Sequence, residues 1–139
     1  MQYSKHGNTI FCRIEKGEEI TAALLKLAEI ENIGAAGISG IGATDNFTAG
    51  IFDTSKHCYN EVHFTGDHEI TSLTGSLTRM NQKPYQHLHI TCAGADGVVK
   101  GGHLLSATVS LTAEIIVTVL EGEVTRKRNE ELGINLIEP

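Results

Sequence analysis

The sequence predicts a single domain of the α+β class, in which one amphipathic helix covers an antiparallel sheet. The chain has 139 residues, which is enough for one hydrophobic core. Only residues 16–33 show a helical period, whereas the chain after residue 46 is rich in Thr, Val and Ile and is interrupted by turn residues. Strands therefore outnumber helices, and the helix is expected to cover one apolar face of the sheet.

The first expected elements are a strand and the helix. Residues 8–15 alternate between apolar and polar side chains, as in a half-buried strand. Glu18 and Glu19 are expected in the first helical turn, where acidic groups suit the helix dipole, and Gly34 is expected to end the helix. The apolar positions of the helix are Ile20, Leu24, Leu27 and Ile30.

A glycine-rich segment follows the helix. Its glycines are Gly34, Gly37, Gly40 and Gly42. A phosphate-binding loop would follow a strand and open a helix, whereas these glycines follow a helix and precede strands. Close backbone packing or bulges in a curved sheet is the better interpretation.

The remaining chain is expected to be nearly all strand. Strands are expected at residues 47–53, 58–64, 68–79, 85–93, 102–111 and 114–122, with breaks at 66–67, 82–84 and 94–97. Asp96, inside the last of these breaks, is expected to form a turn. Residues 129–139 are expected to be a docked or loosely ordered tail.

Composition and charge narrow the functional classes. The formal net charge of −6 argues against broad phosphate binding, and the basic residues 125–128 run into acidic ones, so they are expected to form a solvated face. No secretory signal and no apolar run long enough for a membrane span is visible, so a cytoplasmic protein is expected. The cysteines are Cys12, Cys58 and Cys92, which are expected to be free thiols in a reducing compartment.

Three histidines lie close together in the sequence. His87 and His89 share one face of a strand, whereas Leu88 and Ile90 share the other. His103 opens the next strand after two glycines, which allow a close backbone approach. If the three imidazoles converge in space, they can occupy three corners of a zinc tetrahedron and leave the fourth corner open. The alternative is an ordinary solvated strand, because HxH pairs also occur there. The other histidines, His6, His57, His63 and His68, are expected at the surface, with His63 held in reserve as a further candidate.

Several segments resemble a known family. "RIEKGEEI", "ALLKLAEIENIGAAGISGIGA", "EITSLTGSL", "HLHITCAGADGVVKGGHLL" and "TAEIIVTVL" are similar to the PPC domain, shared by plants and prokaryotes, from about residue 3 to residue 124. The resemblance implies one PPC-type domain over residues 1–139, with a core at about 3–124 and a tail at 125–139. It also implies a strongly bent antiparallel sheet wrapped around one main α-helix, and association as a homotrimer. In prokaryotic members with this pattern, His87, His89 and His103 match the metal ligands, and the fold is distantly similar to acetolactate decarboxylase, a zinc enzyme that also uses an HxH pair and a later histidine. Zinc is favoured because imidazole-only sites suit it, although Fe, Ni and Cu also bind imidazole.

DNA binding is less well supported by the same resemblance. Plant members contact DNA largely through AT-hooks, which are short basic arms, and this chain contains no such arm. Its negative charge also argues against a surface that follows phosphates.

The sequence therefore leaves two candidate functions. The first is metal-dependent chemistry on a small oxygenated substrate, for which Glu114 is the candidate proton-transfer carboxylate and Arg79 the candidate cation, although both residue types are more often simply exposed. The second is a regulatory module that binds DNA or a protein partner without catalysis. A trimeric scaffold whose polar strand faces meet at the subunit boundary is the plainest alternative.

Overall fold

The computed structural model describes residues 1–138, and most of them lie in strands. Strands account for 70% of the chain, whereas the single helix has 11 residues. The prediction of an α+β domain with a main helix is therefore wrong, because the protein is one large bent sheet with a short helix. The difference arises because segments that were expected to be separate strands or loops continue into one another as long bent strands.

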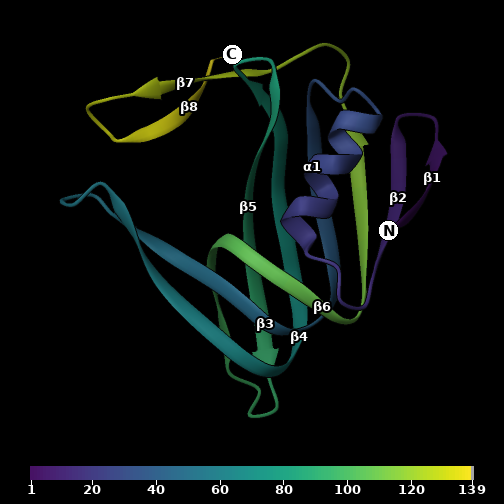
Figure 1. Ribbon diagram of the computed structural model, residues 1–139, viewed down its shortest axis with the longest axis vertical. Helices are drawn as coiled ribbons and strands as arrows, with labels where there is room; N and C mark the ends of the chain where they lie inside the picture. The colour runs from purple at the N-terminus through teal and green to yellow at the C-terminus, as the bar shows by residue number, and fades with distance from the viewer. Residues whose placement is uncertain (139) are drawn as a thin grey trace.

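Eight strands and one helix follow one another along residues 1–138 (Figure 1). They are β1 (Gln2–His6), β2 (Thr9–Glu15), α1 (Ile20–Ile30), β3 (Ala36–Asp53), β4 (Cys58–Met80), β5 (Lys83–Gly94), β6 (Val99–Val119), β7 (Thr125–Asn129) and β8 (Ile134–Glu138). Within residues 1–138, no helix is both long and apolar enough to cross a membrane.

All eight strands belong to one sheet. Its order is β1-β2-β6-β3-β4-β7-β8, and β5 pairs with both β4 and β6. All pairings are antiparallel except a single parallel contact between Arg79 of β4 and Thr125 of β7. Since β3 also pairs with both β4 and β6, the four long strands form a closed ring of pairings.

The predicted break at residues 66–67 is a bend inside β4, and β6 likewise runs through residues 112–113 without ending. Both strands continue because β3 keeps pairing with them on either side of the bend, at the cost of shifts in register. The breaks at 82–84 and 94–97 are confirmed as turns at about these positions, and Asp96 accepts a hydrogen bond from the Val98 amide (3.0 Å).

The glycine-rich segment after the helix forms the first half of β3. A Cβ atom at Gly42 would lie 2.6 Å from the Ala113 Cα atom, and one at Gly40 would lie 2.4 Å from the Ile115 side chain. A register shift also falls between these two glycines. The prediction of close packing or bulges is therefore confirmed at Gly40 and Gly42, whereas a Cβ atom at Gly37 would meet no atom within 4 Å.

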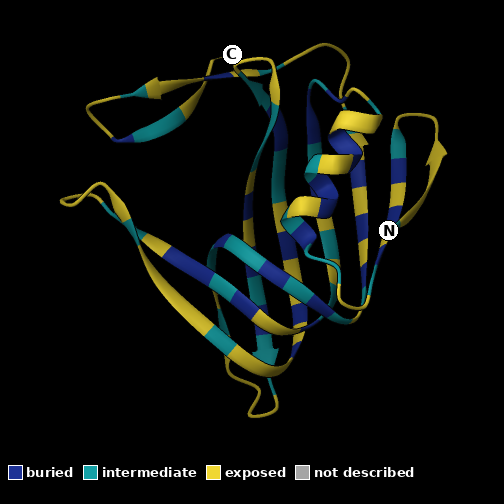
Figure 2. Cartoon of the chain, in the orientation of Figure 1, coloured by how far each residue is buried: buried dark blue, intermediate teal, exposed yellow. Residues whose placement is uncertain are grey.

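Helix α1 lies on the apolar face of the sheet, with its exposed residues turned outward (Figure 2). Its buried residues are Ile20, Ala23, Leu24, Leu27 and Ala28. Ile30, predicted on the apolar side, is exposed at the last residue of the helix. Glu19 caps the helix by accepting hydrogen bonds from the Thr21 and Ala22 amides, so neither Glu18 nor Glu19 lies in the first turn.

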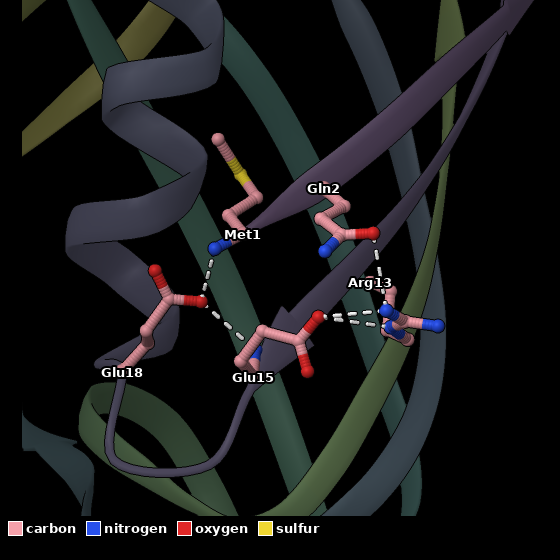
Figure 3. A network of polar contacts seen from close by, with 5 residues as sticks. All are labelled: Met1, Gln2, Arg13, Glu15 and Glu18. Atoms are coloured by element: carbon pink, nitrogen blue, oxygen red, sulfur yellow. Dashed lines mark hydrogen bonds and ion pairs between the residues drawn. The ribbon is translucent and has the colours of Figure 1, made fainter.

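Glu18 instead takes part in a polar network beside the helix (Figure 3). Its carboxylate contacts the amino group of Met1 and accepts a hydrogen bond from the Glu15 amide (2.8 Å). The hydrogen bond from the amino group holds the pKa of Glu18 below its ordinary value. This network fixes the start of β1 against the turn that leads into the helix.

The segment expected to be a tail forms the β7–β8 hairpin. The basic residues at its start were expected to be a solvated face, but the Arg126 side chain is buried, with 8% of its surface exposed. Lys127 and Arg128 are exposed as predicted. The error arises because the hairpin docks on β4 and turns Arg126 toward the sheet.

Candidate metal centre

Strand β5 places two of the three histidines. His87 and His89 lie on one face, where they are exposed, whereas Leu88 and Ile90 are buried on the side of the helix. The alternation predicted from the sequence is therefore confirmed. Across the neighbouring strand β4, the residues opposite these histidines are Ser76 and Thr74.

His103 joins them from a corner of the strand ring. It pairs with His89 of β5 and with Gly50 of β3, because β6 leaves β5 at this position and continues along β3. Only residues 99–103 of β6 pair with β5, so the histidine is not carried to the far end of the strand. A Cβ atom at Gly101 would lie 2.0 Å from the Ile90 carbonyl oxygen, which shows how closely the two strands approach.

Substitution of Gly101 by Ala is expected to destabilise the protein by about 1–3 kcal/mol, because the added methyl group must push β6 away from β5. The matched control is Gly37→Ala, since a Cβ atom there meets no atom within 4 Å. Urea unfolding of both variants checks this. Equal stability of the two variants would contradict the close approach.

The three imidazoles converge. One ring nitrogen from each of His87, His89 and His103 lies within 4.8 Å of the other two, and the ring centroids are 5.1 to 5.6 Å apart. Three nitrogens about 2.0–2.1 Å from a tetrahedral zinc would be about 3.4 Å apart, so small side-chain rotations suffice to bring them to that distance.

The surroundings of two of these rings favour their neutral form. The pKa of His103 is lowered to about 4, mainly by burial and to a smaller extent by the neighbouring His87 and His89. Partial desolvation is the main cause that lowers the pKa of His87, and the charges of Arg126 and His89 lower it further. Neutral imidazole is the form that binds a metal ion. In addition, the buried Nδ1 atom of His103 has no hydrogen-bond partner among residues 1–138, so the residues present fit a metal ion.

The lowered pKa of His103 has a consequence for the metal-free protein. Because the unfolded chain binds this proton at the ordinary pKa of 6.5, the free energy of unfolding is expected to decrease as the pH falls from about 6.5 to about 4. Urea midpoints at pH 7.5 and 5.5 measure this. His103→Asn should reduce the pH dependence, whereas the exposed control His6→Asn should leave it as in the wild type. An unchanged pH dependence in His103→Asn would contradict the burial of this ring.

Aromatic and polar side chains surround the cluster. The Tyr59 ring stacks on His103, with 4.4 Å between the centroids and 13° between the planes. The pKa of Tyr59 is raised, mainly by burial and to a smaller extent by Tyr85. The Tyr85 ring lies 5.1 Å from the guanidinium carbon of Arg126.

The sequence did not point to Tyr59, Tyr85 or Arg126. Tyr85 carried a usable signal, because it lies two residues before His87 and therefore on the same face of the strand. Tyr59 and Arg126 depend on pairings between distant segments, which the sequence does not reveal.

The two other predicted site residues lie elsewhere. Glu114 is exposed on β6, opposite Arg13 of β2 and Ile41 of β3. Arg79 donates to the Asn32 side chain (2.8 Å) and to the Gln82 carbonyl (3.1 Å). Neither is brought to the histidines by these contacts, and their catalytic roles stay predictions from the sequence.

Of the remaining histidines, one was wrongly predicted. His68 is buried, with 9% of its surface exposed, because its ring packs edge-on against Phe47 and its Nδ1 atom lies 2.6 Å from the Gly66 carbonyl oxygen. The exposed histidines outside the cluster are His6, His57 and His63, as predicted.

The fold and the cluster define a class of protein: a bent, almost wholly antiparallel sheet in which an HxH strand and a third histidine converge. The sequence matches the Plants and Prokaryotes Conserved (PCC) domain over residues 1–121. The chain therefore belongs to this family, which is the PPC family named above.

Solved structures agree with this assignment. A "putative dna binding protein" from Bacteroides thetaiotaomicron is 34% identical, with a TM-score of 0.96 over 99% of this chain and 96% of that chain. The metal-containing protein of Archaeoglobus fulgidus is 32% identical, with a TM-score of 0.89 over 100% and 99% of the two chains. A plant- and prokaryote-conserved protein from Pyrococcus horikoshii is 30% identical, with a TM-score of 0.88 over 99% and 95%. A comparison with proteins of curated function gives no match.

Proposed function

We propose that the protein binds one zinc ion through His87, His89 and His103 and performs metal-dependent chemistry on a small oxygenated substrate. The observation that carries the proposal is the convergence of three imidazole nitrogens within 4.8 Å, together with the unpartnered Nδ1 atom of His103 among the described residues. The similar protein from Archaeoglobus fulgidus, which is described as metal-containing, supports the metal.

Three protein ligands are typical of catalytic rather than structural zinc, because the fourth position stays open for water or substrate. Bound there, zinc would polarise a carbonyl oxygen or lower the pKa of a bound water. In this chain the three imidazoles hold the ion, and the Tyr59 ring, stacked on His103, limits the rotation of that ring and excludes water from its face.

Metal analysis of protein purified without chelator tests the proposal. We expect close to one zinc ion per chain, and we expect acetate to bind at the open position. Protein that is free of metal and takes up none on exposure to zinc would contradict the proposal.

We also propose that the protein is a cytoplasmic homotrimer. Phe11, Ile41 and Ile116 are exposed on neighbouring strands β2, β3 and β6, and such an apolar surface is typical of a subunit interface. Light scattering should give three times the 15.0 kDa mass of the chain. A monomeric mass would contradict the trimer.

DNA binding is the second candidate function, because two similar structures, from Bacteroides thetaiotaomicron and Ralstonia eutropha, are described as "putative" DNA-binding proteins. The burial of Arg126 leaves only Lys127 and Arg128 of the basic segment exposed, which weakens that candidate. Titration with duplex DNA at physiological salt separates the two functions, since a specific DNA-binding protein retains affinity there. We expect no binding.

A further inference from the structure

The buried side chain of Arg126 is the starting point. It extends from β7 onto β4, where its Nε donates to the Thr78 hydroxyl (2.9 Å) and its Nη2 lies 3.4 Å from the Ser76 hydroxyl. Its Nη1 donates to the Asn135 carbonyl (2.9 Å). A guanidinium has five N–H groups, so each Nη retains one N–H that these bonds do not use.

Arg126 lacks a counter-ion within the described part of the chain. Its three hydrogen-bond partners are neutral, and no carboxylate of residues 1–138 forms an ion pair with it. Only 8% of its surface is exposed. A buried charge is normally compensated, so among residues 1–138 one positive charge is left without a balancing group.

The unbalanced charge lies beside the histidine cluster. Ser76, which Arg126 contacts, is directly opposite His87, so both lie on the same face of the sheet. The effect of Arg126 on the pKa of His87 agrees with this proximity. Because three neutral imidazoles do not reduce the charge of a divalent ion, the loaded site and Arg126 together would carry three positive charges.

Two aromatic rings give this region flat walls. Tyr59 stacks on His103, and Tyr85 lies under the guanidinium of Arg126. Tyr85 also contributes to the raised pKa of Tyr59. A small, flat molecule is better suited to such walls than a bulky or branched one.

We propose that the site binds a small organic carboxylate that carries a second oxygen atom. Its carboxylate group accepts hydrogen bonds from the two unused N–H groups of Arg126, and the second oxygen takes the open metal position. This inference rests on the proposed metal site and adds the chemical class of the substrate to it.

Binding of pyruvate to zinc-loaded protein, measured by calorimetry, tests the inference. Wild-type protein is expected to bind pyruvate and not its neutral amide, pyruvamide. Arg126→Met is expected to weaken pyruvate binding by about 10- to 100-fold with unchanged zinc content, because a charge-assisted hydrogen-bonded pair is lost. The matched control is Lys127→Met, which removes the neighbouring exposed charge and is expected to leave the affinity unchanged.

A second variant covers the case that Arg126→Met does not fold. Thr78→Asp places a carboxylate against the Arg126 Nε and supplies the counter-charge from within the chain. It should keep the fold and the zinc, yet weaken pyruvate binding to a similar extent.

The outcomes separate the two proposals. The carboxylate inference alone would be overturned if zinc-loaded protein bound pyruvate and pyruvamide with equal affinity. It would also be overturned if neither Arg126→Met nor Thr78→Asp changed the affinity for pyruvate. A protein that binds no zinc would overturn both.

Discussion

Replacement of both His87 and His89 by Ala is expected to lower the zinc content from close to one ion per chain to nearly zero. Each imidazole supplies one of three ligands, and a single remaining imidazole cannot hold the ion against a chelator. The measurement is elemental analysis after dialysis against a weak chelator. Retention of zinc in the double variant would show that the ion lies elsewhere.

The matched control for this experiment is His63→Ala. His63 is exposed on β4 and stands outside the cluster, so its removal should leave the zinc content unchanged. Because His87 and His89 are themselves exposed, the double variant should unfold at nearly the same urea concentration as chelator-treated wild type. A large loss of stability would assign the two histidines to the packing of the sheet.

Leu88→Ala is expected to lower the stability of the protein and to leave zinc binding intact, which is the opposite of the effect expected for the double histidine variant. Leu88 lies between the two histidines but points to the core, where 1% of its surface is exposed. Its truncation should reduce the free energy of unfolding by about 2–5 kcal/mol, because it leaves a cavity beneath the helix. Urea unfolding measures the loss, and the folded variant should still bind zinc.

Leu120→Ala serves as the control for Leu88→Ala. The same change is made at an exposed residue just after β6, and the expected loss is within about 0.5 kcal/mol. Equal losses at the two positions would contradict the alternation of faces along β5.

The sequence predicted local structure better than the fold class. The period of α1 and the alternation of β5 depend on neighbouring residues, and both were predicted correctly apart from the helix ends. The length of β4 and β6 depends on pairing with β3 across a bend, and nothing near residues 66–67 or 112–113 reveals that pairing. A glycine at a bend and a glycine at a strand end look alike in a sequence.

In the candidate site, too, local patterns predicted some residues, whereas residues that depend on long-range pairing were missed. His87 and His89 follow from spacing, whereas His103 joins them only because β6 changes partner from β5 to β3 at that residue. Arg126 was assigned to a solvated face because its neighbours are charged, and its burial depends on the docking of the β7–β8 hairpin on β4. Residues that reach a site through long-range pairing are the ones that local patterns miss.

Anomalous diffraction at the zinc absorption edge, from crystals grown without chelator, tests the central claim most directly. We predict one peak per chain, at about 2.0–2.1 Å from a ring nitrogen of each of His87, His89 and His103, with water or a small anion at the fourth position. The absence of a peak between these rings, or a fourth protein ligand that closes the site, would contradict the proposed metal chemistry.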